Sequence, residues 1–403
     1  MDFALTPEDE AFRDELRSWL ADNLPEFQDG TEITDTWLPR SFARRRVWQK
    51  RLHEGRWAAI NWPTEWGGRE ATIMQNFIYS EEMARARAPG IINAVGIWHV
   101  GPMILEHGTE EQAQRWCPGI LTADEIWCQG FSEPEAGSDL ANLRCTAIRD
   151  GDHYVVNGEK IWITTAHMAD WGMFLLRTDP TAIGRGAKHE GITAFVLDMR
   201  TEGIEVEPIR DIADEHAFNH VRFTDARIPI ESRLGGEGEG WLVAMGTLSH
   251  ERVGTAGLSI SMKTELDEMV ATARELNPGA LEDPLLRDRL ARAYTRVELT
   301  RLLTARALSK ILKGQPNWPE VPLAKLQWSY LSQTLAELGV DLLGPAGVLW
   351  KGGPDAVEKG RWSRSYVYQR YTSIGAGTTE VQKNIIAERA LKMPSKRSKR
   401  TGN

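Results

Sequence analysis

The spacing of apolar residues changes twice along this chain, and this restricts the folds it can adopt. In residues 6–122 apolar residues recur at helical spacing, with Pro and Gly interruptions. In residues 125–234 the pattern becomes short β-branched and aromatic runs. Long helical runs return from Gly240 onward. The sequence therefore predicts a helical domain in 1–124, a small β domain in 125–234 and a second helical domain in 235–395, followed by a basic tail in 396–403.

Two turn dipeptides mark the β domain. Asp150-Gly151 and Asn157-Gly158 flank the run HYVV, and such dipeptides favour tight turns between antiparallel strands. The pattern predicts a hairpin here, with a turn at each dipeptide.

Composition excludes several function classes. A net charge of -9 and a pI near 5.6 argue against nucleic-acid binding, which needs an excess of Lys and Arg. The three cysteines form no C-x-x-C pair, and the first residues have no signal-peptide pattern, so we expect a reducing, cytoplasmic environment. No apolar run is long enough for a membrane span.

His216 and His220 have a metal-like spacing without a companion ligand, so we predict no metal site.

Three segments carry the chemistry. The first segment is FSEPEAGSD (131–139), the second segment is NGEKIWITT (157–165), and the third segment is SIGAGTTEVQ (373–382). The first two place hydroxyls and backbone N–H groups beside Gly or Pro. Such groups can hold a polar heteroaromatic ring and a diphosphate. A hairpin with a buried aromatic residue and turn glycines remains the alternative interpretation.

Together the segments closely resemble the signatures of acyl-CoA dehydrogenases, and the resemblance runs from about Phe3 to Leu391. It implies an α+β multidomain fold with an N-terminal helical domain, a central small β-barrel-like domain and a C-terminal helical bundle. It also implies FAD as the cofactor. By resemblance, Phe131 and Ser132 lie against the flavin, Trp162 packs on its ring and Thr164 donates toward its N5 atom. Ser138 would reach the diphosphate. Gly137, Thr378 and Gln382 complete the cofactor-binding set.

The implied reaction is removal of two hydrogens from an acyl-CoA thioester. The Cα proton is too weakly acidic to leave unaided, so a base and a polarised carbonyl are required. Many family members carry the catalytic Glu at the position of Ala376. A backbone N–H needs no side chain, so Ala376 can still polarise the carbonyl while the base comes from elsewhere.

Glu251 is the candidate base. If 240–262 is one helix, the face of Glu251 is mostly apolar or small, which should raise the pKa of its carboxyl group. Glu251-Arg252 resembles the Glu-Arg pair of one subset of the family, which includes the isovaleryl-CoA and long-chain enzymes. By this resemblance Glu251 is the base and Arg252 helps to order it, while hydride passes from Cβ to flavin N5. A core Glu neutralised by its neighbouring Arg is the alternative.

Two stretches depart from the family. In many relatives one subunit uses them to bind the adenosine diphosphate of its neighbour's FAD. Here they read NPGALEDPLLRDRL (277–290) and DLLGPAG (341–347), with Asp341 where Gln is usual. A homo-oligomer, dimer or tetramer, of the pimeloyl-CoA dehydrogenase-like type explains this. A heterotetramer with a sister subunit is the alternative. An electron-transferring flavoprotein is the electron acceptor that the resemblance implies.

Other functions remain open. A flavin oxidase or monooxygenase on the same fold would produce peroxide or insert oxygen, and a catalytically silent subunit would lack turnover. Gly375 and Ala376 remove bulk beside the expected Cα position, which favours branched, dicarboxylic or polycyclic acyl chains such as steroid side chains.

Overall fold

The computed structural model describes residues 5–28, 39–250, 256–315 and 320–394. The chain forms two compact units, and each is described by itself. The first unit comprises Met1–Thr34, Thr72–Ala88 and Val253–Asn403, and the second comprises Asp35–Ala71 and Pro89–Arg252. The N-terminal helices are thus divided between the two units. The ranges proposed above for three domains stay a prediction.

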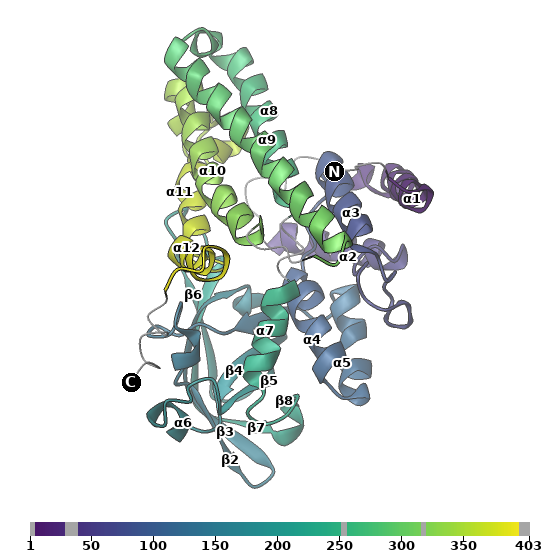
Figure 1. Ribbon diagram of the computed structural model, residues 1–403, viewed down its shortest axis with the longest axis vertical. Helices are drawn as coiled ribbons and strands as arrows, with labels where there is room; N and C mark the ends of the chain where they lie inside the picture. The colour runs from purple at the N-terminus through teal and green to yellow at the C-terminus, as the bar shows by residue number, and fades with distance from the viewer. Residues whose placement is uncertain (1–4, 29–38, 251–255, 316–319, 395–403) are drawn as a thin grey trace. The chain divides into compact units, whose positions relative to one another are not determined.

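The first unit is helical (Figure 1). Its long helices α8, α9 and α10 pack side by side around a core that includes Met269, Leu335 and Trp362. Thr6 and Thr72 cap α1 and α3 through capping boxes, which satisfy the first free N–H groups of each helix. The helices of this unit are α1 (Pro7–Asn23), α3 (Ile73–Arg85), α8 (Ala256–Leu276), α9 (Pro284–Leu312), α10 (Glu320–Leu343), α11 (Arg361–Tyr368) and α12 (Thr379–Ile385).

The second unit joins short helices to a sheet. Its helices are α2 (Pro39–Glu54), α4 (Gly101–His107), α5 (Glu110–Thr122), α6 (Thr181–Gly184) and α7 (Gly240–His250). Asn93 connects the helices of this unit to its sheet. Its side chain donates to the Ile120 and Glu125 carbonyls and accepts from Trp127 N–H at 2.9 Å. This buried amide therefore fixes the start of the strand that leads into the first segment.

The sheet of the second unit has eight strands in the order β6-β7-β3-β2-β4-β5-β8, and β1 pairs with β4 in parallel. Most neighbours are antiparallel, so short connections can join them. The strands are β1 (Trp127–Gly130), β2 (Thr146–Asp150), β3 (His153–Thr164), β4 (Trp171–Arg177), β5 (Ile192–Asp198), β6 (Ile204–Ile209), β7 (Phe218–Pro229) and β8 (Arg233–Leu234).

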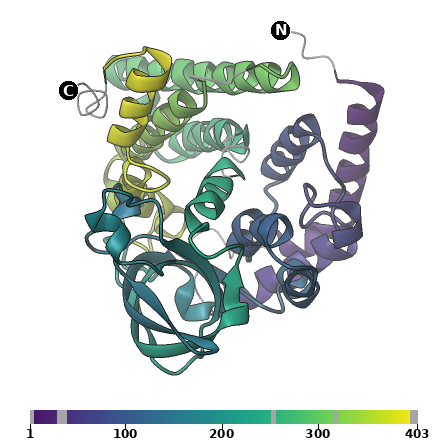
Figure 2. The ribbon, with the colours of Figure 1, turned by 60° about the horizontal axis from the view of Figure 1, so that its bottom comes forward.

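Ring contacts show that this sheet curls on itself. Phe174 of β4 meets Phe223 of β7 at 5.3 Å between ring centroids, and Tyr154 of β3 meets Phe195 of β5 at 4.9 Å. Neither pair comes from adjacent strands, so the sheet must bend for these rings to touch. Figure 2 shows the resulting barrel-like ring of strands. The α+β fold with a β-barrel-like centre is therefore confirmed.

The hairpin prediction was right at one dipeptide and wrong at the other. Asp150-Gly151 forms the turn between β2 and β3. Asn157-Gly158 forms no turn, because β3 continues through it with a register shift between Val156 and Gly158. Asn157 instead exchanges two hydrogen bonds with Asp225 on β7, at 2.9 and 3.0 Å. The dipeptide therefore makes a β-bulge, which also accommodates a positive φ.

None of the helices in the described ranges has both the length and the apolarity that a membrane span requires.

Gly158 should tolerate no side chain. Its φ of +131° is one that other residues rarely adopt, and a Cβ there would lie 2.8 Å from Cys145 Cα. We expect Gly158→Ala to lower the free energy of unfolding by about 1–3 kcal/mol from backbone strain, and contact with Cys145 to add to this loss. Urea unfolding followed by tryptophan fluorescence measures this.

Gly151→Ala is the matched control. Its φ is +63°, but no atom lies within 4 Å of the added Cβ. An equal loss of stability in both variants would show that contact with Cys145 does not matter.

Candidate active site

The first segment leaves β1 as a closed loop. Glu133 and Ala136 exchange backbone hydrogen bonds of 3.2 and 3.0 Å, which closes a turn around Pro134. Phe131 is buried, whereas Ser138 is exposed. At Gly137 no atom lies within 4 Å of where a Cβ would be, so the backbone there borders open space. The loop therefore offers exposed backbone and hydroxyl groups from a fixed base.

The second segment ends in a bulge that lifts an aromatic ring out of the sheet. The pairing of β3 with β7 shifts register between Lys160 and Ile163. Trp162, between them, has a φ of +63° and is 59% exposed, and its ring touches Phe218 edge-on. A non-glycine residue with positive φ is strained, and such strain concentrates at functional sites. Trp162 is thus an exposed aromatic held at a conformational cost.

A backbone hydrogen bond joins the two segments. Because β3 bulges away from β7, Ile161 N–H is released and donates to the Ser132 carbonyl at 2.9 Å. Trp162 and the half-buried Ser132 therefore lie on neighbouring stretches of backbone. The structure thus brings Ser132 and Trp162 close together within the second unit.

Sequence reasoning missed four polar residues that support this arrangement. Lys160 and Glu133 form a buried ion pair of 2.8 Å between the two segments. His167 Nδ1 lies 2.9 Å from Asn219 Oδ1, and the Asn219 amide donates to the Ile163 carbonyl, so His167 must be the donor. Burial lowers the pKa of His167. The inward positions of β3, which include Tyr154 and Val156, lead by alternation to Lys160, and this signal could have revealed it.

The third segment belongs to the first unit. Ala376 and Gly377 have positive φ angles of +52° and +80°, and the Thr378 side chain caps α12 by accepting from Val381 N–H. Ile374 and Gly375 N–H both donate to the Tyr371 carbonyl. Among the described residues no hydrogen-bond acceptor is recorded for Ala376 N–H, and Ala376 is exposed. The loop therefore presents that N–H group for a ligand.

Gln382 lies against the same loop. A Cβ on Gly377 would come within 2.8 Å of Gln382 Nε2, the end of a flexible side chain, so it is the φ of +80° that favours glycine there. Thr378, Gln382 and Ala376 are thus grouped within the first unit. Glu251 and Arg252, the predicted base and its neighbour, lie outside the described residues.

A buried lysine anchors the third segment. Lys325 on α10 donates to the Thr372 carbonyl at 2.5 Å and to Ser329 Oγ at 2.9 Å, and Ser329 Oγ also donates to Thr372. Burial lowers the pKa of Lys325 to about 8, opposed by the charge of Glu380. The turn before Ala376 is therefore fastened to a long helix.

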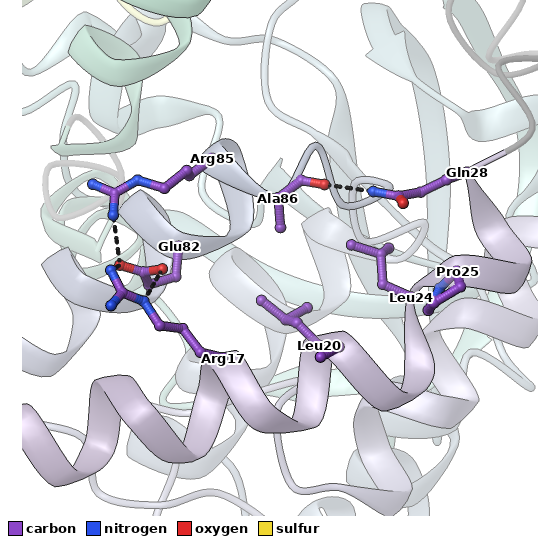
Figure 3. A pocket seen from close by; sticks show the side chains of 9 residues that line it. Arg17, Leu20, Leu24, Pro25, Gln28, Glu82, Arg85 and Ala86 are labelled. Carbon is purple, nitrogen blue, oxygen red and sulfur yellow. Dashed lines mark hydrogen bonds and ion pairs between the residues drawn. The ribbon is translucent and has the colours of Figure 1, made fainter.

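A cavity of about 290 Å³ lies elsewhere in the first unit, between α1 and α3 (Figure 3). Its charged groups are paired with one another: Arg17 makes two bonds of 2.8 Å to Glu82, and Arg85 also contacts Glu82. Gln28 donates to the Ala86 carbonyl. These contacts hold the helices together and carry no evident chemistry.

No group of three or more His, Cys, Asp or Glu side chains suited to a metal occurs in the described part of the chain. His220, one of the two spaced histidines, contacts Glu159 at 2.7 Å.

Comparison with known proteins decides the family. Models of the N-terminal, middle and C-terminal domains of acyl-CoA dehydrogenases match residues 6–124, 128–226 and 238–391. Acyl-CoA dehydrogenase IpdE1 of Mycobacterium tuberculosis is 37% identical over 96% of this chain and 98% of its own length. The chain belongs to the acyl-CoA dehydrogenase family.

Solved structures agree with this assignment. One described as the Tcur3481-Tcur3483 steroid ACAD has a TM-score of 0.85 and 30% identity, and covers 98% of this chain and 100% of its own. The ChsE4-ChsE5 complex from Mycobacterium tuberculosis has a TM-score of 0.83 and 31% identity, with coverage of 98% and 100%. This acyl-CoA dehydrogenase is therefore an oxidoreductase, as predicted, and its described residues carry the family's fold over nearly the whole chain.

The buried Lys325 should make stability depend on pH. Its pKa is lowered to about 8 in the folded protein from 10.5. Between these values the unfolded chain binds more protons, so stability rises with pH in this window. Relative to Lys325→Met, the wild type should therefore gain free energy of unfolding between about pH 8 and about pH 10.5, as measured by urea unfolding at several pH values.

Comparing the two proteins at each pH removes effects of other groups. Lys313→Met, at an exposed lysine, is the control. A flat difference between wild type and Lys325→Met across this window would contradict the interpretation.

Proposed function

We propose that this acyl-CoA dehydrogenase uses FAD to introduce an α,β double bond into an acyl-CoA thioester, with Glu251 as the base. The observation that carries the proposal is the hydrogen bond between Ile161 and Ser132, which sets the exposed Trp162 beside the first segment. An exposed indole next to free backbone and hydroxyl groups suits a ligand with a flat ring and a diphosphate.

The residues present fit FAD. Phe131, Ser132, Trp162 and Thr164 would hold its ring, and Gly137 with Ser138 would hold its diphosphate beside open space. The resemblance also assigns Thr378 and Gln382 of the third segment to FAD binding. Bound FAD would supply the acceptor for the hydride that leaves Cβ.

The protein's own groups would then manage the proton and the carbonyl. Ala376 N–H would donate to the thioester oxygen, where negative charge develops as the Cα proton leaves. Its positive φ and its place after the anchored Thr372 support this role. Glu251 would take the Cα proton, and Arg252 would order that carboxylate.

The buried face of α7 supports Glu251. Ala244 and Thr247 are fully buried and precede Glu251 by seven and four positions, which is helical spacing. The structure describes α7 only to His250, and we propose that its helical phase extends to Glu251. A carboxyl group in that phase would be shielded from water, and desolvation raises the pKa of a carboxyl group. A raised pKa suits a general base near neutral pH.

Glu251→Gln should retain FAD and lose turnover by about 10²- to 10⁴-fold, because the amide cannot accept the Cα proton. Product formation is followed with an artificial electron acceptor, and exchange of the Cα proton with deuterated water is measured separately. Glu231→Gln, at an exposed carboxylate, is the control. Turnover and exchange near wild type in Glu251→Gln would refute the assignment.

The two departing stretches meet in the first unit. Arg289 of 277–290 and Asp341 of 341–347 form an ion pair of 2.7 Å between α9 and α10. The pair leaves an acidic group where relatives place a neutral Gln. Two similar structures are described by pairs of names, Tcur3481-Tcur3483 and ChsE4-ChsE5. These points support assembly with a sister subunit that supplies the adenosine contacts, in preference to a homo-oligomer.

The chain expressed alone should therefore contain less than one FAD per subunit, because the adenosine contacts of the sister subunit would be missing. Flavin absorbance after denaturation measures the content, and light scattering measures the assembly. A homo-oligomer with full FAD content would instead support the alternative.

The substrate we propose is a polycyclic acyl-CoA of the steroid type. The similarity to a structure described as a steroid ACAD supports this, as do the small residues Gly375 and Ala376. A panel of straight, branched, dicarboxylic and polycyclic acyl-CoA thioesters would test it. An electron-transferring flavoprotein would reoxidise the enzyme.

A further inference from the structure

The ion pair between Lys160 and Glu133 has no part in the chemistry proposed above. Its two residues come from different segments, 27 positions apart, and the Lys160 side chain is 0% exposed while that of Glu133 is 7% exposed. A buried ion pair is weak evidence for stability, because desolvation offsets much of the attraction. A role in holding a specific geometry is the better-attested use of such a pair.

The bonds around the pair end on backbone groups of the first segment and the residues after it. Lys160 Nζ donates to the Phe131 carbonyl at 3.1 Å as well as to Glu133. The Glu133 carboxylate accepts from Arg144 N–H at 2.6 Å and Cys145 N–H at 2.9 Å. The pair therefore ties the entry of the loop, its first turn and its exit to a single point on β3.

Residues on either side of the loop have their own anchors. Ile161, next to Lys160, bonds to Ser132. Arg177 is buried and donates to the Leu143 and Ala141 carbonyls, which fixes the chain after the loop. Lys160 holds the Phe131 carbonyl and the Glu133 carboxylate, one on each side of Ser132. Phe131 and Ser132 are the residues of the first segment that are assigned to the flavin ring.

We propose that Lys160 and Glu133 are a positioning pair that sets the first segment in register with the second and thereby determines the affinity for FAD. The inference rests on the proposed function, since it takes these segments to bind FAD. The pair acts through Phe131 and Ser132 and touches neither substrate nor reacting atoms. An apolar pair of similar volume could fill the same space, but it could not hold a carbonyl and two N–H groups at defined positions.

The test compares Lys160→Met with Lys160→Met/Glu133→Gln. The single variant leaves a buried carboxylate without its cation, which costs stability. The double variant removes both charges and keeps an acceptor oxygen for Arg144 or Cys145, so its stability should recover. Neither variant can donate from position 160 to the Phe131 carbonyl. Lys188→Met is the control, because Lys188 makes an exposed ion pair with Asp139 of the same loop.

The protein is purified in the oligomeric form that binds FAD, and the cofactor is then removed. Two quantities are measured on this cofactor-free protein. One is the urea unfolding midpoint of the protein without cofactor. The other is the FAD dissociation constant, from quenching of flavin fluorescence on titration, with the visible spectrum of the bound flavin recorded alongside. None of these requires turnover of an acyl-CoA.

Both variants should bind FAD at least about tenfold more weakly than wild type, equivalent to about 1.4 kcal/mol. The double variant should regain its unfolding midpoint without regaining FAD affinity, and Lys188→Met should match wild type. If affinity returned together with stability, the pair would be merely structural and the inference would be overturned. Unchanged affinity in both variants would overturn it too. Failure of the wild type to bind FAD would overturn the proposed function and this inference together.

Discussion

The change of hydrogen-bonding partner along β3 is the interaction on which the candidate site depends. Up to Lys160 this strand pairs with β7, and after it the Ile161 N–H turns to the Ser132 carbonyl. Buried backbone groups must find partners, so a strand that leaves its neighbour needs a substitute close by. The loop after β1 is that substitute. The same bulge gives Trp162 its strained backbone and exposes its ring.

Buried cations are used repeatedly in this protein to hold backbone carbonyls. Lys160 holds Phe131, Arg177 holds Ala141 and Leu143, and Lys325 holds Thr372. Loops have carbonyls that no helix or strand satisfies, and a cation offers several donors to one region. The carbonyls that these three cations hold lie at, or within four residues of, one end of the first or the third segment. Buried cations thus hold these loops in place by donating to their backbone carbonyls, whereas a buried charge without such partners would be unfavourable.

The fold was largely predictable from the sequence because periodicity and turn residues are local. The helical and β segments and the turn at Asp150-Gly151 follow from such patterns. Asn157-Gly158 was misread because its partner, Asp225, lies 68 positions away and decides that the dipeptide is a bulge. Of the site, the segment residues could be named from motifs. The Lys160–Glu133 pair could be predicted only in part, since alternation along β3 points Lys160 inward but nothing in the first segment shows that Glu133 is its partner.

Charge balance also bears on how the cofactor's adenosine half is held. The Arg289–Asp341 pair is half exposed, and such pairs contribute only about 0–1 kcal/mol, so a ligand could separate them. Separation would nevertheless leave the Asp341 carboxylate beside any diphosphate that Arg289 bound. Like charges at that distance repel, and the favourable contact would be offset. A position where Gln is usual in relatives is thus acidic here, and its charge is balanced by Arg289 of the neighbouring helix.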